Sequence, residues 1–125
     1  MATTIGKTFT FAAAHYLSNL PPGHKCARLH GHTYTVTVEL TADDLIEPGF
    51  VTDFGDLAPF YEYLKVHLDH RLLNDVLDQE PTCELIARHL ADWFQRHVEA
   101  QIPGRLHALA VAESPTSWAR WEVRR

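Results

Sequence analysis

The 125-residue sequence lacks the long hydrophobic runs and the basic charge that mark several large classes of protein. No apolar stretch approaches the roughly 20 residues that a membrane-spanning helix needs. The opening residues, MATTIGKTF, lack the apolar core of a secretory signal. The formal net charge of -5 argues against general binding of nucleic acid, which favours basic proteins. We therefore expect neither a membrane partner nor a nucleic-acid partner.

Cysteine is also scarce, because two residues are too few for a disulfide framework. We therefore expect free thiols and a reducing, cytoplasmic location. The glycine-rich motif of dinucleotide-binding proteins (G-x-G-x-x-G) does not occur either, so nothing in the sequence indicates a nicotinamide cofactor. Histidine, by contrast, is abundant. Nine histidines in 125 residues indicate metal or proton chemistry.

The length and composition fit one globular domain over residues 1–125, with 46% hydrophobic and 22% charged residues. Alternating side chains predict strands at 5–16 and 30–40, and two more at 105–113 and 117–123. A segment punctuated by prolines and glycine joins the first two strands and is predicted to be a loop.

Two helices are predicted between the two pairs of strands. Asp53 is a suitable N-cap for a helix that ends near Leu68. Thr82 is a suitable N-cap for a second helix over 83–101, in which apolar residues recur at helical spacing. The dipeptide 103–104, Pro-Gly, ends that helix. The predicted order is ββααββ.

The segment CARLHGH (26–32) contains two histidines separated by one glycine. Residues i and i+2 of a strand point to the same side, about 6.5–7 Å apart, so the imidazoles of His30 and His32 can converge on one cation. His15 ends the preceding strand, on the face that carries its apolar residues. If the two strands are neighbours, three histidines with an open fourth position resemble a catalytic zinc site. The alternative is that they are ordinary polar residues at strand ends.

Cys26 lies four residues before His30, and this spacing alone does not decide its role. As a fourth ligand, its thiolate would close the site and make it structural. As a free thiolate beside a cation, it could accept a proton or attack a substrate. The second cysteine, Cys83, lies in the first turn of the later helix, where a small residue without a chemical role is the simpler interpretation.

Two further groups offer acid–base chemistry. In LDHRLLND (68–75), Asp69 precedes His70, and a carboxylate that orients an imidazole makes a good proton shuttle. The alternative is a histidine that suits the dipole at a helix C-terminus. Glu113 ends a mostly apolar strand, either as a solvated strand end or as a buried anchor for paired N–H groups of a ligand.

Taken together, these segments resemble the 6-pyruvoyl-tetrahydropterin synthase family and, within it, a bacterial branch that forms 6-carboxytetrahydropterin. The C-x3-H-G-H element with LDH downstream is far more specific than a lone pair of histidines. The matching segments occur in the family's order and span nearly the whole chain: FAAAH (11–15), GHKCARLHGH (23–32), VTDFGDL (51–57), LDHRLLND (68–75), PTCE (81–84) and the strand that contains Glu113.

The resemblance implies an α+β tunnelling fold, in which a four-stranded antiparallel sheet carries two helices on one face. Three subunits would close a barrel, and two trimers would stack into a homohexamer. Closure of the barrel would also cover the edge strands of so small a sheet, which otherwise invite uncontrolled pairing.

The resemblance also implies which residues bind metal and which accept protons. Residues matching His15, His30 and His32 bind Zn2+ in the family, and the cysteine matching Cys26 is the catalytic proton acceptor. Three residues separate that cysteine from His30, as in the carboxy branch, whereas the pyruvoyl branch has a longer spacer.

Other residues are implied to hold and protonate the substrate. Residues matching Asp69 and His70 form a proton relay, and the glutamate matching Glu113 holds the pterin ring. The PTCE segment adds Thr82 and Glu84 to the substrate site. It also departs from the family pattern, which usually reads P-T-[S/T]-E, and we expect the cysteine at that position to have a small effect on pterin binding.

The implied reaction converts 7,8-dihydroneopterin triphosphate to 6-carboxy-5,6,7,8-tetrahydropterin, acetaldehyde and triphosphate, in the synthesis of 7-deazaguanine (queuosine) precursors. Arg28, Lys25 and Arg71 are candidates for guiding the triphosphate. The alternatives are the 6-pyruvoyl-tetrahydropterin synthase reaction on the same substrate and a non-catalytic zinc-binding module that Cys26 closes.

Overall fold

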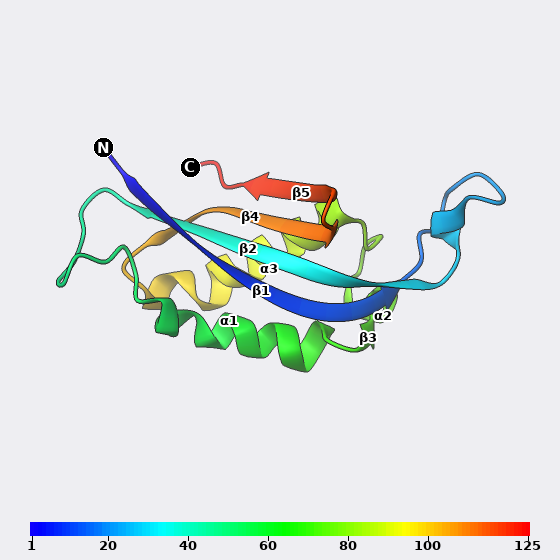
Figure 1. Ribbon diagram of the computed structural model, residues 1–125, viewed down its shortest axis with the longest axis horizontal. Helices are drawn as coiled ribbons and strands as arrows, with labels where there is room; N and C mark the ends of the chain where they lie inside the picture. Colours follow the sequence, from blue (N-terminus) through cyan, green and yellow to red (C-terminus); the bar gives the residue numbers. More distant parts are fainter.

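One five-stranded sheet organises the computed structural model, which describes residues 1–125. Its strand order is β3-β1-β2-β4-β5, and Figure 1 shows the four long strands side by side. The longest pair, β1 (Thr3–His15) and β2 (His30–Ala42), is antiparallel along its whole length. The two segments predicted to be strands are therefore neighbours, and His15 lies directly opposite His30.

Alternation along the strands gives the sheet one buried face. On β2 every second residue from Tyr34 to Leu40 is fully buried, whereas the threonines between them are more exposed. The buried face of β1 carries Phe9, Phe11, Ala13 and His15. The helices pack on this face, and one core cluster of buried residues joins them to the sheet.

The other side of β2 pairs with β4 (Arg105–Ser114), which in turn pairs with β5 (Ser117–Glu122). Both strands are confirmed within one residue of their predicted ends. Thr35 is the partner of Ala112, so the next residues, Tyr34 and Glu113, share the buried face. This register brings the carboxylate to the same end of the sheet as the histidines.

The first predicted helix forms as three consecutive helical segments of different types. Asp53 is its cap, as predicted, and accepts a hydrogen bond of 2.9 Å from the backbone N–H of Gly55. A 3₁₀ turn, η2 (Phe54–Leu57), leads into α1 (Ala58–Tyr63), and a π turn, η3 (Leu64–Leu68), ends the run at the predicted residue. Its core residues are Leu57, Phe60, Leu64 and Leu68.

The longest helix is α3 (Cys83–His97), and Thr82 is its N-cap, as predicted. The threonine hydroxyl accepts a hydrogen bond of 3.1 Å from the N–H of Leu85. The helix ends four residues before the predicted end, and a separate 3₁₀ turn, η4 (Glu99–Gln101), follows. None of the helices combines the length and the apolar character that crossing a membrane requires.

The expectation of four strands and two helices is wrong in both counts. A fifth strand, β3 (Arg71–Leu72), runs parallel to β1, and a third α-helix, α2 (Leu73–Val76), follows it. A strand of two residues cannot show alternation, and a single helical turn cannot show a hydrophobic stripe. A tertiary contact creates the strand instead: the N–H of His70 donates to the carbonyl of Ala12 at 2.6 Å and aligns the next residues with β1.

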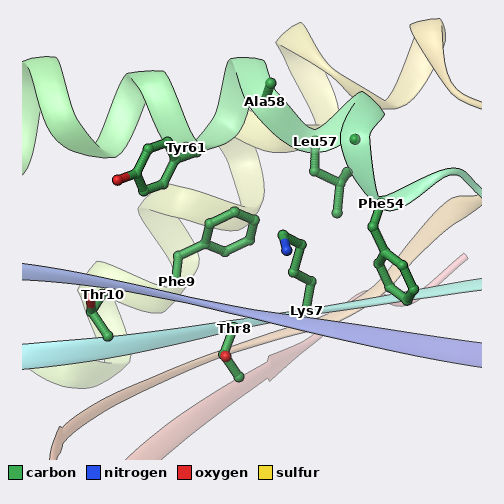
Figure 2. A pocket seen from close by; sticks show the side chains of 9 residues that line it. Lys7, Thr8, Phe9, Thr10, Phe54, Leu57, Ala58 and Tyr61 are labelled. Carbon is green, nitrogen blue, oxygen red and sulfur yellow. The ribbon is translucent and has the colours of Figure 1, made fainter.

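A hollow of about 480 Å³ lies between the middle of β1 and α1 (Figure 2). Nζ of Lys7 lies 5.7 Å and 5.9 Å from the ring centroids of Phe9 and Phe54. Thr10 is the residue of this lining that lies nearest to His15 along β1, and five residues of extended strand span roughly 16 Å. This hollow is therefore separate from the site described below.

Candidate metal centre

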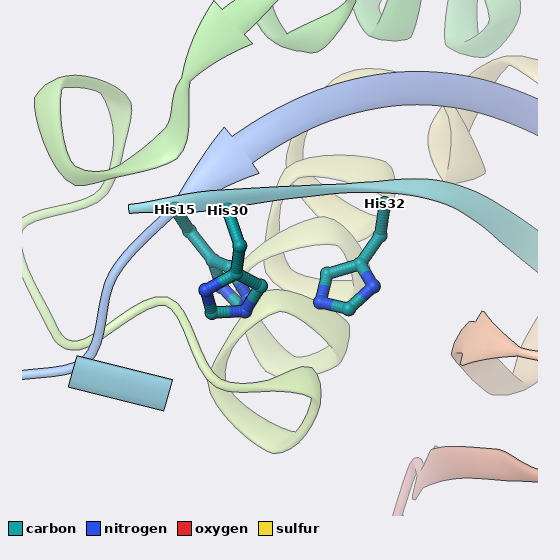
Figure 3. A group of neighbouring side chains, drawn as sticks. All are labelled: His15, His30 and His32. Carbon is teal, nitrogen blue, oxygen red and sulfur yellow. The ribbon is translucent and has the colours of Figure 1, made fainter. Parts of the chain in front are cut away.

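Three histidines converge at the end of the β1–β2 pair (Figure 3). His15 and His30 are opposite each other, and His32 follows on the same side of β2. One ligand atom from each ring lies within 4.8 Å of the other two. The closest two, Nε2 of His15 and Nε2 of His30, are 2.9 Å apart. The fold thus brings together the three predicted ligands, and these residues could hold a metal ion.

Backbone carbonyls determine which nitrogen of two rings carries the proton. Nδ1 of His15 lies 2.7 Å from the carbonyl oxygen of Pro81, and Nδ1 of His30 lies 2.6 Å from that of Arg28. Because a carbonyl only accepts, each Nδ1 donates its N–H, and each neutral ring has its lone pair on Nε2. Two lone pairs therefore face each other, an arrangement that is repulsive unless a cation or a proton lies between them.

The donor set fits a zinc ion. Nitrogen–zinc bonds of about 2.0–2.1 Å in a tetrahedron place two ligand atoms roughly 3.3 Å apart, close to the separation of His15 and His30. Burial is the main cause that lowers the pKa of His15, so the neutral, ligating form of this ring is favoured. Carbonyls such as those of Pro81 and Arg28 are the usual outer partners of metal-bound histidines.

Glu113 approaches the centre from β4. Its Oε2 lies 3.8 Å from Nε2 of His32. Cys83, at the start of α3, is influenced by this carboxylate. Burial first, and then the charge of Glu113, raises the pKa of Cys83 to about 12, so the thiol stays protonated. The electrostatic influence of Glu113 on Cys83 shows that the start of α3 lies near the predicted pterin-binding group, which its position in the sequence does not reveal.

Tyr34 belongs to the same cluster, although it is not among the predicted site residues. Its ring lies edge-on to those of His15 and His32, with centroids 5.9 Å and 5.5 Å away. It is fully buried, yet its hydroxyl has no hydrogen-bond partner. Burial is the main cause that raises the pKa of Tyr34, and the charge of Glu113 adds to it, so the hydroxyl stays neutral. Strand alternation could have placed this ring on the histidine face, but no local pattern marks the unpaired hydroxyl.

Cys26 lies outside the group of ligand atoms. That group contains the three histidines and not the thiol, and both cysteines of the chain are free. Cys26 is in η1 (Lys25–Ala27), the 3₁₀ turn of the loop that projects beyond the sheet in Figure 1. The geometry favours three histidine ligands with an open fourth position over a site that Cys26 closes.

Asp69 and His70 form a hydrogen-bonded pair, with 2.9 Å between Oδ2 and Nδ1. The other carboxylate oxygen, Oδ1, accepts the N–H of Ala12 at 2.8 Å. This N–H is the first cause that lowers the pKa of Asp69, and His70 and Lys65 lower it further. The carboxylate therefore stays ionised and orients the imidazole. His70 has a φ of 59°, a left-handed conformation that histidine adopts more readily than most residues.

The relay pair faces the other side of the sheet from the three imidazole rings. The His70 side chain is 83% exposed and borders a hollow of about 630 Å³ that Ala14 and Gly31 also line, together with neighbouring residues of both strands that include His32. Ala14 and Gly31 are a cross-strand pair directly beside His15 and His30. Because successive side chains alternate, the two pairs lie on opposite faces. The chain thus assembles the metal ligands and the relay pair at the same end of the sheet but on different sides.

The other predicted substrate residues lie on α3, on the loop that contains Cys26 and on β3. The hydroxyl of Thr82 caps α3, and Glu84 is exposed in the first turn of that helix. Arg28 and Lys25 are exposed in the loop, whereas Arg71 donates from its guanidinium to a backbone carbonyl at 3.2 Å. The cationic side chains of the loop are therefore accessible to an anionic ligand.

A family model described as 6-pyruvoyl tetrahydropterin synthase matches residues 4–123. The chain belongs to the 6-pyruvoyl tetrahydropterin synthase family. The 6-carboxy-5,6,7,8-tetrahydropterin synthase of Synechocystis sp. is 44% identical over 125 residues, which cover 94% of this chain and 91% of the relative. The protein of the same name from Bacillus subtilis is 31% identical over 122 residues, which cover 91% and 81% of the two chains. Membership of this family confirms the expectation that the chain is an enzyme.

Solved structures share the architecture. The 6-pyruvoyl tetrahydropterin synthase of Caenorhabditis elegans superposes with a TM-score of 0.85 at 22% identity, over 99% of this chain and 97% of the other. The α+β tunnelling fold that the resemblance implied is therefore confirmed as an architecture, with five strands and three α-helices in this chain.

Proposed function

We propose that this enzyme depends on zinc and converts 7,8-dihydroneopterin triphosphate and one water molecule to 6-carboxy-5,6,7,8-tetrahydropterin, acetaldehyde and triphosphate, a step toward 7-deazaguanine (queuosine) precursors. The observation that carries the proposal is the facing pair of Nε2 atoms of His15 and His30, with both Nδ1 atoms occupied by carbonyls. Two relatives that match most of the chain are named for this product. The short spacer between Cys26 and His30 also favours the carboxy branch.

The buried face supplies the groups that hold metal and substrate. His15, His30 and His32 would bind the zinc ion, which when present lowers the pKa of hydroxyl groups that coordinate it. Glu113 would hold the pterin ring, because a carboxylate accepts two parallel hydrogen bonds from adjacent N–H groups.

Two groups would transfer protons. Cys26 would remove a proton from the side chain of the substrate, since a nearby cation favours the thiolate form of a cysteine. His70, oriented by Asp69, would handle a second proton. The ring would gain its hydrogens from the side chain of the same substrate, so the reaction needs no nicotinamide.

The relay pair would act on the metal centre of a neighbouring subunit, because it faces away from the imidazoles of its own chain. The outer edge of β1 is unpaired except at Ala13 and Ala14, where β3 pairs with it, and β5 is the opposite edge of the sheet. Pairing of these edges between subunits would close a barrel of three chains. The proposed assembly is a cytoplasmic homohexamer made of two such trimers.

Incubation of the zinc-loaded protein with 7,8-dihydroneopterin triphosphate, followed by mass analysis of the pterin, tests the proposed function. We expect the mass of 6-carboxy-5,6,7,8-tetrahydropterin. The mass of 6-pyruvoyl-tetrahydropterin would instead assign the chain to the pyruvoyl reaction. Unchanged substrate would contradict both reactions and favour a zinc-binding module without this catalytic activity.

A further inference from the structure

The loop that carries Cys26 keeps its shape without buried side chains. None of the residues 18–29 is buried. Backbone hydrogen bonds close its turns: the N–H of His24 donates to Pro21 at 3.1 Å, and the N–H of Ala27 donates to His24 at 3.0 Å. A segment with so few buried contacts depends on such bonds for its conformation.

One side chain of the loop adds a hydrogen bond within it, and that side chain is His24. Its Nδ1 accepts the backbone N–H of Cys26 at 3.1 Å. His24 has the extended backbone of an N-cap, with φ -64° and ψ 130°, and its ring caps η1 as asparagine or serine caps other helices. A neutral imidazole accepts at Nδ1 when its proton is on Nε2.

The capped turn connects the thiol with the metal centre. The carbonyl of Cys26 accepts the N–H of Leu17 at 2.9 Å, which ties the turn to the end of β1. After the turn, the N–H of Arg28 donates to the carbonyl of Lys25 within the turn at 3.2 Å. The carbonyl of Arg28 in turn accepts the hydrogen bond from Nδ1 of His30. A displacement of η1 would therefore move the thiol and the carbonyl that orients a metal ligand together.

We propose that His24 is a positioning residue for the reaction, which through Nδ1 holds the N–H of Cys26 and so sets where the thiol stands against the substrate. The inference rests on the proposed role of Cys26 as proton acceptor. His24 itself transfers no proton in this account. A misplacement of about 1 Å at a reacting group can cost roughly a hundredfold in rate, so the loss of one capping bond has a measurable effect.

Asparagine and glutamine at this position separate capping from other roles of the imidazole. The amide oxygen of asparagine reaches the place of Nδ1 and caps helices well, whereas the amide of glutamine lies one methylene further out. We expect His24→Asn to keep kcat close to wild type and His24→Gln to lower kcat roughly ten- to a hundredfold. KM should change little in either variant. His67→Gln, which removes an exposed imidazole from η3, is the matched control and should behave as wild type.

Amide hydrogen exchange gives a readout that does not depend on turnover. In the loop peptide that contains Cys26, exchange should accelerate in His24→Gln and stay at the wild-type rate in His24→Asn. Zinc content should stay at the wild-type level in His24→Asn, which keeps the cap. Kinetic measurements on Cys26→Ala, made in parallel, distinguish the two proposals. A wild-type rate in that variant would show that Cys26 is not the proton acceptor, and it would contradict the proposed function itself.

Two outcomes would overturn the role of His24 while leaving the proposed function intact. One is a wild-type kcat in His24→Gln. The other is an equal loss in His24→Asn and His24→Gln with a raised KM, because the imidazole itself would then contact the substrate.

Discussion

His15 and His30 face each other across the end of the β1–β2 pair, with their Nε2 atoms 2.9 Å apart and their Nδ1 atoms committed to backbone carbonyls. Neither ring can turn its lone pair away without losing its carbonyl partner. The hydrogen-bond pattern of the two strands and their flanking loops thus prepares a site for a cation before any cation binds.

The first prediction concerns the metal. His30→Ala should lose nearly all bound zinc, because it removes one of three nitrogen ligands and leaves His15 facing empty space. Metal analysis of the purified variant checks this, with His67→Ala as the control that removes an exposed histidine elsewhere. Full zinc retention in His30→Ala would show that the metal lies somewhere else.

The second prediction separates the thiol from the ligands. Cys26→Ala should keep its zinc and its stability but lose most turnover, because the thiol lies outside the group of ligand atoms. Zinc content, thermal unfolding and rate are measured on the same preparation. A parallel fall of zinc and stability would make Cys26 a structural ligand instead, since metal binding contributes to folding.

The third prediction follows from the lowered pKa of Asp69. A carboxylate with a lowered folded pKa stabilises the fold above its unfolded value of about 3.9, and this contribution is lost as the pH falls through the folded pKa. Asp69→Asn should therefore reduce the free energy of unfolding by about 1 kcal/mol at pH 7. Denaturant unfolding from pH 7 down to pH values below the lowered folded pKa checks this, and the difference from wild type should vanish there. A difference that is constant with pH would contradict the role of the charge.

Much of this architecture is readable from the sequence because it depends on local periodicity. The alternation in HGHTYTVTVEL (30–40) is enough to place both histidines and Tyr34 on one face, and Asp53 and Thr82 mark helix starts by capping chemistry. The third histidine could be added because neighbouring strands in a sequence usually pair.

The remaining features depend on contacts between distant segments. The hydrogen bonds of Ala12 with Asp69 and His70 create β3 and turn the relay pair to the other face, and no local pattern encodes them. The influence of Glu113 on the pKa of Cys83 likewise depends on how the start of α3 meets the end of β4. Such pairings appear only when the register of the whole sheet is known.

The fourth prediction concerns the subunits. Light scattering should show a hexamer, or at least a trimer, and an active monomer at micromolar concentration would contradict the shared site. Cys26→Ala and His70→Ala should each be nearly inactive alone. Co-assembled in equal amounts, they should regain about a quarter of the wild-type rate, because that share of randomly formed sites joins an intact thiol to an intact relay pair. No recovery from mixed hexamers would place both groups in one subunit.

The release of acetaldehyde tests the central claim most directly, because the carboxy reaction breaks a carbon–carbon bond of the substrate and the pyruvoyl reaction does not. Zinc-loaded protein is incubated with 7,8-dihydroneopterin triphosphate, and acetaldehyde is measured with a coupled alcohol dehydrogenase, with Cys26→Ala as the blank. We predict one acetaldehyde for each substrate consumed and none above background in the variant. Consumption of substrate without acetaldehyde, with 6-pyruvoyl-tetrahydropterin as the product, would contradict the account.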